Sequence, residues 1–415
     1  MVELTDQEQR WLHGDHGQAM QLAMRLIVTA AEIDGAAELV EVDFAHINSC
    51  HWSGRMSEDF AEFLLAEGGR LSVPTFTNAS LIDCARPELR PEVQTPAAVR
   101  GARRVMEIYE QLGCEPIWTC APYHDAAARP SLGQHVIGSE SNAVSFYNSA
   151  LGARTNKYGD LFDIAGAMVG RVPLSGLHLD AGRAASLHVQ LDDFADDAFD
   201  DPSTFHALGI WLGETVATSI AAVDGLPRAS ETDLKAIAAA GATSGSVALF
   251  HLIGITPEAA TFDDAFRGGT PDRAFVVRPD DLRTVAGRLS TGDGPLNAIC
   301  LGTPHFSVDE FGDLVRLLDD RRISPSVEVL VTTSRAVSHE IGLRGWGDRL
   351  EAAGVQVVLD TCTYYTPRPT GVEGLVMTNS AKWAYYAPGI LDVDVAFANL
   401  ADCVESAVAG EVVRS

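Results

Sequence analysis

Apolar positions along this chain follow two periods, one typical of helices and the other of buried strands. Over residues 6–33, Trp11, Leu22, Leu26 and Ile27 recur at helical spacing, which predicts an amphipathic helix softened near Gly14. From residue 39 onward, short apolar runs alternate with polar loops and further helical segments. That alternation predicts an α/β protein in which helices flank parallel sheets.

Strands and helices are predicted in turn through both halves of the chain. Apolar runs indicate strands at 39–44, 71–73, 116–118, 296–301, 327–331 and 355–359. Helical patterns cover 95–112, 345–353 and the segments that follow Ser57 and Ser307. Ser307 and Glu310 have the spacing of a capping box, which predicts a helix that runs to residue 320.

Chemically useful residues follow several of these predicted strands. Cys120, Cys300 and Cys362 all fall at or near a strand end, as do the loops AHINSC and PTFTN. Ligands of parallel α/β sheets collect outside the carboxyl ends of the strands. We therefore expect these segments to meet at one cleft.

The stretch 139–160, SESNAVSFYNSALGARTNKYGD, is polar and has no apolar stripe of helical or strand period. Such a segment is expected at the surface or along a wet pocket. Its amides, its hydroxyls and Arg154 suit a small anionic, oxygen-rich substrate. The same residue types are ordinary loop material, so both interpretations stay open.

The charge and hydropathy of the chain exclude some classes of binding partner. The 415 residues carry 57 acidic and 30 basic side chains, for a net charge of -27. This field would repel a polyanion, which excludes nucleic acid as a partner. The acidic N-terminus does not indicate export, and residues 236–257 are too weakly apolar for a membrane span, so we expect a cytoplasmic protein without membrane contact.

Two rare residue types merit separate interpretation. The seven cysteines are odd in number and scattered, which favours thiols, catalysis or metal ligation over a disulfide framework. Cys120, Cys300 and Cys362 could share one metal centre, or each could be a small buried apolar residue. Lys382, one of three lysines, lies among apolar residues, so a functional role and a structural ion pair are both open.

Ten segments together resemble the large subunit of the aconitase X family. They are, in chain order, GDHGQAM, AHINSCHWSG, VPTFTN, TCAPY, SESNAVSFYNSALGARTNKYGD, SGLHLD, LFHLIGITPEA, GTPHFS, DTCTYYTP and MTNSAKWAYYAPG. The resemblance implies the aconitase-superfamily architecture of α/β domains around a central cleft. We place the domains at 1–160, 161–270 and 271–415.

The resemblance also implies an enzyme that removes water from a small 3-hydroxy acid. The family contains cis-3-hydroxy-L-proline dehydratases and mevalonate 5-phosphate dehydratases, and the small number of cations in the motif loops favours the first. An iron-sulfur cluster or mononuclear iron would act as Lewis acid. Cys120 and Cys362 match cluster-binding positions, whereas Thr303 stands where many members have cysteine, so Cys300 is the candidate third ligand.

Site residues and a partner follow from the same resemblance. Lys382 and Glu140 are expected to be catalytic, and Lys382 also to bind the substrate together with Ser53, Thr75, Asn78, Ser141, Asn142, Arg154 and Asn156. A separate small swivelling subunit is expected to close the cleft. An inactive metal-binding scaffold is the alternative outside catalysis, since a fold does not guarantee function.

Overall fold

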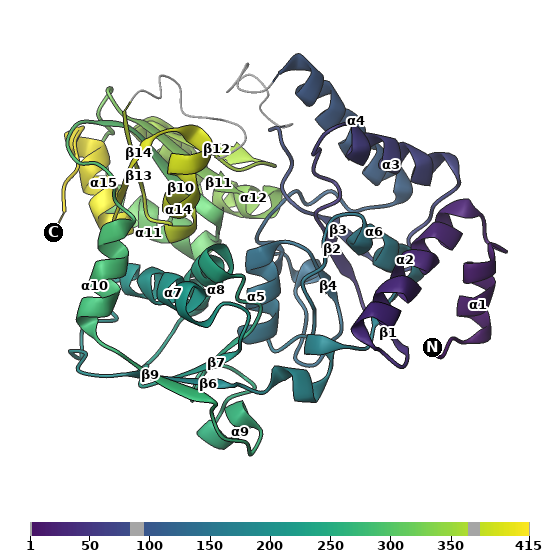
Figure 1. Ribbon diagram of the computed structural model, residues 1–415. Helices are drawn as coiled ribbons and strands as arrows, with labels where there is room; N and C mark the ends of the chain where they lie inside the picture. The colour runs from purple at the N-terminus through teal and green to yellow at the C-terminus, as the bar shows by residue number, and fades with distance from the viewer. Residues whose placement is uncertain (1, 84–94, 364–373, 415) are drawn as a thin grey trace.

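Three parallel sheets with helices packed around them make up the computed structural model of the chain (Figure 1). The described residues are 2–83, 95–363 and 374–414. The N-terminal part lies to the right in Figure 1, the C-terminal part at upper left and the middle part below it. The predicted α/β fold class is confirmed.

The N-terminal part of the chain builds a small parallel sheet covered by helices. Its elements are α1 (Asp6–His13), α2 (Gln18–Asp34), β1 (Leu39–Glu41), β2 (Ala45–Ile47), α3 (Arg55–Ala66), β3 (Thr75–Thr77), α4 (Pro96–Leu112), β4 (Ile137–Gly138), α5 (Ser141–Ser149), α6 (Phe162–Val169) and β5 (Arg171–Pro173). The sheet has the order β3-β2-β4, and β1 pairs with β5 in antiparallel fashion.

Several predicted boundaries in this part are wrong. The helix expected over 6–33 is two helices, because the chain turns at Gly14 and Gly17, where φ is 92° and 95°. No strand forms at 71–73 or 116–118; β3 lies just beyond the first, and Glu115 makes only an isolated bridge with Phe76. The helix at 95–112 is confirmed as α4, which Thr95 caps.

The middle part contains a four-stranded parallel sheet of order β8-β7-β6-β9. Its elements are β6 (Leu187–Leu191), α7 (Ser203–Val216), β7 (Ala221–Asp224), α8 (Glu231–Gly245), β8 (Phe250–Leu252), α9 (Phe262–Phe266), β9 (Arg273–Val277) and α10 (Pro279–Arg288). The stretch 236–257 is buried helix and strand, as expected. Among the described helices, none is both long and apolar enough to cross a membrane.

The C-terminal part is a doubly wound sheet of order β12-β11-β10-β13-β14. Its elements are β10 (Leu296–Phe306), α11 (Val308–Leu318), β11 (Glu328–Thr333), α12 (Arg335–Leu343), α13 (Trp346–Ala353), β12 (Val355–Leu359), β13 (Leu375–Thr378), α14 (Ala381–Leu391), β14 (Asp394–Phe397) and α15 (Leu400–Ala409). The predicted capping box at Ser307 is confirmed, whereas β10 runs five residues past its expected end. The chain winds outward in both directions from β10 and β13, so the topological switch point lies between them.

One apolar core joins the three parts. It includes Phe146 of α5, Leu208 of α7 and Trp383 of α14, each at most 1% exposed. In Figure 1, α5 lies centrally between the N-terminal part and α8, against which it packs. This core holds the beginnings of α5 and α14 in place, and the candidate functional site lies there.

Candidate active site

A cavity of about 260 Å³ lies where loops of the N-terminal part meet those of the C-terminal part. Its walls come from residues that follow β2 and β3, from the start of α5, from α14 and from the ends of C-terminal strands. They are Asn48, His51, Asn78, Ala79, Cys120, Glu140, Ser141, Thr303, Cys362, Lys382, Tyr386 and Ile390. The expected cleft at strand ends is therefore present.

A buried ion pair forms one wall of this cavity. Glu140 is the residue before α5, and its carboxylate accepts from Lys382 Nζ at 2.6 Å. The two side chains are 15% and 11% exposed. Burial alone would raise the pKa of Glu140, but the Lys382 charge and donated hydrogen bonds outweigh it and lower that pKa to about 2. Although burial opposes the charge on Lys382, Glu140 raises the pKa of Lys382, so both groups are charged near neutral pH.

Two amides fix the Glu140 carboxylate. Asn78 Nδ2 donates to Glu140 Oε2 at 3.0 Å and to Asn48 Oδ1 at 2.7 Å. Asn142 Nδ2 donates to Glu140 Oε1 at 2.8 Å and to the Cys120 carbonyl at 2.9 Å. Fully buried Asn142 thus connects the ion pair to the thiol-bearing loop, from behind the cavity wall.

His305 joins the loops that carry the two cysteines of the cavity. Its Nε2 lies 2.9 Å from the Thr361 carbonyl, so Nε2 carries the proton and Nδ1 accepts from the Thr119 hydroxyl at 2.9 Å. Burial lowers the pKa of His305 to about 4, which keeps the ring neutral. Its backbone N–H also donates to Cys120 Sγ at 3.4 Å. His305 therefore has a structural role next to Cys120 and Cys362.

The donor set of the cavity fits an iron group only in part. Among the described residues, no group of three or more His, Cys, Asp or Glu side chains is placed to hold a metal ion. Cys120 and Cys362 nevertheless share the cavity with Thr303, whose buried hydroxyl has no hydrogen-bond partner there. Burial and then Glu140 raise the pKa of Cys120 to about 11, so without a metal this thiol is protonated. Two thiols and one hydroxyl suit a centre that takes two thiolates from this chain.

Cys300 does not line this cavity. It lies inside β10, 1% exposed and paired in register with Leu330 of β11. Because β10 continues to Phe306, Thr303 and not Cys300 borders the cavity. No disulfide joins the described cysteines, and Cys84 lies outside the described residues.

Five of the residues predicted to bind substrate do not line the cavity: fully buried Asn142 and four others. Ser53 is exposed beyond His51, and the Thr75 hydroxyl donates to the Val73 carbonyl. Arg154 is ion-paired with Asp180 and donates to the His178 carbonyl. Asn156 lines a separate, more open cavity and bonds Ser175 O and Leu177 N. Asn78 and Ser141, in contrast, line the cavity beside Glu140 and Lys382.

The cavity also contains residues that were not selected from the sequence. Asn48 and His51 come from the segment AHINSCHWSG, whose first three residues form β2, and burial lowers the pKa of His51. The position of these two residues directly after a strand is the sequence signal that could have identified them. Tyr386 and Ile390 lie one and two turns beyond Lys382 on α14, and helical spacing from Lys382 would have identified them.

Comparison with known proteins identifies the family. Sequence profiles of the first, second and third domains of aconitase X match residues 1–181, 185–287 and 296–409. The chain belongs to the aconitase X family. It is 42% identical to a cis-3-hydroxy-L-proline dehydratase of Pseudomonas aeruginosa, over 97% of this chain and 69% of the relative.

An archaeal relative and a solved structure extend the comparison. The phosphomevalonate dehydratase large subunit of Methanothermobacter thermautotrophicus is 33% identical over 95% of this chain and 96% of its own length. The crystal structure of Thermococcus kodakaraensis aconitase X in its holo-form matches with a TM-score of 0.85 and 28% identity, covering 98% of this chain and 100% of that one. The family and the hydro-lyase (dehydratase) class expected from the motifs are confirmed.

Proposed function

We propose that this aconitase X chain is the large subunit of a dehydratase that acts on cis-3-hydroxy-L-proline. The observation that carries the proposal is the buried Glu140–Lys382 pair in a small cavity with two thiols. The 42% identity to the Pseudomonas aeruginosa enzyme supports the same substrate.

The charges of the cavity suit a cyclic amino acid. Glu140 is ionised and would accept from the ring ammonium, while the Lys382 ammonium would hold the carboxylate. Asn78 and Ser141 lie beside this pair and would orient the hydroxyl. With the Lys382 ammonium shared with the substrate carboxylate, less of its charge would hold down the pKa of Glu140. Glu140 is the one carboxylate among the described residues of the cavity, which makes it the candidate acceptor of the proton next to the substrate carboxylate.

A thiolate-bound iron or iron-sulfur centre is part of this proposal. Cys120 and Cys362 would hold it, and the Thr303 hydroxyl lies at the same cavity. When bound, such a centre supplies a Lewis acid for the departing hydroxyl. Metal binding would displace the proton that Cys120 otherwise keeps.

A separate small subunit completes the proposed enzyme. The chain matches 96% of an archaeal protein named a large subunit, a name that implies a small partner subunit. We infer that a small swivelling subunit covers the cavity, and the exposed side chain of Ile390 at the cavity wall, 55% accessible, is available for that contact.

Mevalonate 5-phosphate is the second candidate substrate, favoured by the nearly full-length match to the archaeal large subunit. A phosphate needs more positive charge than this cavity shows, because Lys382 is its one lysine or arginine within the described residues. Assays of the reconstituted two-subunit protein with both substrates test the assignment. We expect turnover of the hydroxyproline, and turnover of the phosphate ester alone would reverse the order.

A further inference from the structure

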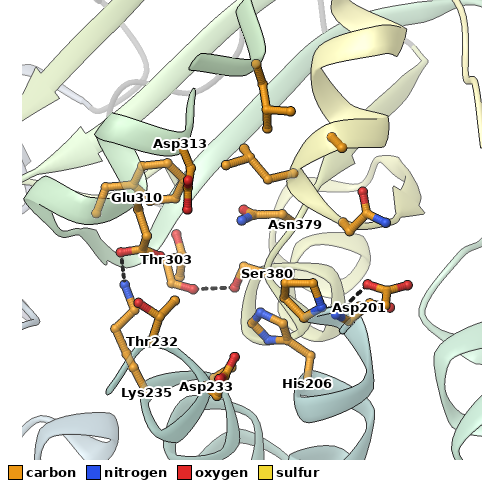
Figure 2. Close-up of a pocket in the computed structure, with 18 of the residues that line it drawn as sticks. Asp201, His206, Thr232, Asp233, Lys235, Thr303, Glu310, Asp313, Asn379 and Ser380 are labelled. Atoms are coloured by element: carbon orange, nitrogen blue, oxygen red, sulfur yellow. Dashed lines mark hydrogen bonds and ion pairs between the residues drawn. The ribbon is translucent and has the colours of Figure 1, made fainter. Parts of the chain in front are cut away.

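A second, larger cavity lies on the other side of Thr303 (Figure 2). Its volume is about 500 Å³, and it is enclosed by α7, α8 and the C-terminal sheet. Residues at the carboxyl ends of β10, β13 and β14 line it, among them Phe306, Asn379 and Asn399. It therefore opens on the crevice at the switch point between β10 and β13, where open α/β sheets bind ligands.

Thr303 lies at the boundary between this cavity and the candidate active site. The Ser380 hydroxyl donates to the Thr303 carbonyl, drawn as a dashed line in Figure 2, and so bridges the ends of β13 and β10. Thr303 lines both cavities. Ser380 also caps α14, because its Oγ accepts from Trp383 N at 3.1 Å. The crevice is thus divided into two compartments, only one of which contains the Glu140–Lys382 pair.

The uncompensated charge of the second cavity is negative. Both of its basic side chains already have carboxylate partners: Lys235 pairs with Glu310, and Arg316 with Asp313 at 2.9 Å. His206 accepts from Ala381 N at 3.4 Å, and burial followed by the nearby Lys235 lowers its pKa to about 3, so the ring is neutral.

Two acidic side chains of this cavity have no cationic partner among the described residues. Asp201 Oδ1 accepts from Ser203 N, and Asp233 Oδ2 accepts from both Ser230 N and Ser230 Oγ. One oxygen of each carboxylate therefore accepts hydrogen bonds at the start of a helix, and the other oxygen is retained for a ligand. Asp201 is exposed, whereas Asp233 is 9% exposed and is drawn at the base of the cavity in Figure 2.

The remaining walls combine apolar surface with an unsatisfied polar group. Pro202, Phe306, Leu317 and Leu400 supply apolar contacts, and the Thr303 hydroxyl, 5% exposed as a residue, has no hydrogen-bond partner in the described structure. A buried hydroxyl without a partner costs free energy unless a ligand or water satisfies it.

We propose that this second cavity is a binding site for a small organic ammonium ligand with an apolar body, distinct from the substrate compartment. The ammonium would lie between the retained oxygens of Asp201 and Asp233, and the apolar body against Phe306 and Leu400. The proposal does not depend on which substrate the active site takes.

Calorimetric titration of the full chain, in complex with the small subunit where one is obtained, tests the site with three probes of matched shape. The probes are 2-phenylethylamine, 2-phenylethanol and 3-phenylpropionate, which are cationic, neutral and anionic at neutral pH. We expect saturable binding of the amine, weaker binding of the alcohol and none of the carboxylate. Asp233→Asn should weaken amine binding about tenfold or more, since it removes a charge-assisted hydrogen bond but keeps a capping oxygen.

Three further variants locate the bound probe. Leu400→Trp should weaken binding of both amine and alcohol by filling the cavity. Asp272→Asn, an exposed acidic residue outside both cavities, and Ser141→Ala, in the candidate active site, should leave amine binding unchanged. Equal binding of all three probes, no saturable binding, unchanged binding in Asp233→Asn, or loss of binding in a folded Ser141→Ala chain would each overturn the proposal.

Discussion

Lys382 Nζ lies 2.6 Å from Glu140 Oε1, although 242 positions separate the two residues in the chain. Glu140 precedes α5 in the N-terminal part, and Lys382 is in the first turn of α14 in the C-terminal part. The pair therefore depends on how these two parts are packed together. Its burial makes each charge costly without the other.

Breaking this pair should affect both stability and turnover. Glu140→Gln leaves a buried ammonium without a counter-ion, and we expect a loss of about 3–5 kcal/mol in the free energy of unfolding. Lys382→Met should cost a similar amount, while the double variant should recover much of the loss because no charge is left unpaired. Urea denaturation of the three variants measures this coupling. Additive losses in the double variant would show that the two side chains act independently.

The same single variants should reduce dehydratase turnover by about two orders of magnitude or more, the usual range for loss of a group that transfers or orients a proton. Ser53→Ala provides the matched control, since Ser53 is exposed and does not line the cavity. Full activity in Glu140→Gln would remove this residue from the proposed mechanism.

The positions of chemically useful loops could be predicted from strand ends. That rule placed Asn78, Cys120 and Cys362 at one cleft, and all three line the cavity, but only Cys362 follows a strand with its predicted bounds. Asn78 follows β3, which lies beyond the predicted strand, and no strand forms at 116–118 before Cys120. It did not place Cys300 correctly relative to the cavity, because an apolar run does not show where a strand that continues through Gly302, Thr303 and Pro304 will end. The predicted role of Cys300 as a ligand stays a prediction.

Within the segment 139–160, the sequence alone could not show that Arg154 and Asn156 lie outside the cavity. Its polar side chains predict a surface position or the wall of a wet pocket, yet α5 is buried from Asn142 to Ser149. Its amides are satisfied internally: Asn148, for example, donates to the carbonyls of Thr155 and Ala248. This buried helix separates Glu140, at the cavity, from Arg154 and Asn156. Only the tertiary hydrogen bonds reveal that separation.

Asp163 should make stability depend on pH. Burial raises the pKa of this carboxyl to about 6, more than the hydrogen bonds from Ser49 and Asn48 lower it. Because the folded pKa lies above the unfolded value, usually near 3.9, its contribution to stability is full below that value and is lost as pH rises through about 6. The side chain holds the backbone N–H groups of Asn48 and Ser49, next to the cavity.

Asp163→Asn should remove this pH dependence. Between pH 4 and 7 the free energy of unfolding of the natural chain should fall by roughly 2–3 kcal/mol relative to that of the variant. Urea denaturation across this range provides the measurement. Asp272→Asn is the control, since Asp272 is exposed and is not among the groups that shift the pKa of Asp163. Parallel profiles for natural chain and Asp163→Asn would contradict a raised pKa.

The iron content of cysteine variants tests the proposed metal ligands without an activity assay. After anaerobic purification, Cys120→Ala and Cys362→Ala should each contain little iron and lack visible absorbance, because each would remove one of the two proposed thiolate ligands. Cys300→Ala should retain both signals, since Cys300 lies within β10 away from the cavity. Loss of iron in a folded Cys300→Ala chain would instead support a three-cysteine centre. A folded natural chain without iron would favour the inactive scaffold.

Asn142 should act by positioning Glu140 and not by contacting the substrate. Its amide joins Glu140 Oε1 to the Cys120 carbonyl, and its Oδ1 accepts from the Tyr123 hydroxyl at 2.9 Å. Asn142→Asp would replace the donor with a second carboxylate, which should raise the pKa of Glu140 through like-charge repulsion. We expect the acidic limb of the pH–rate profile to move to higher pH, with kcat reduced more than KM is changed. Tyr123→Phe removes one hydrogen bond to Asn142 but leaves its donors in place, so that variant should keep the natural profile. A change in KM alone would indicate direct substrate contact by Asn142.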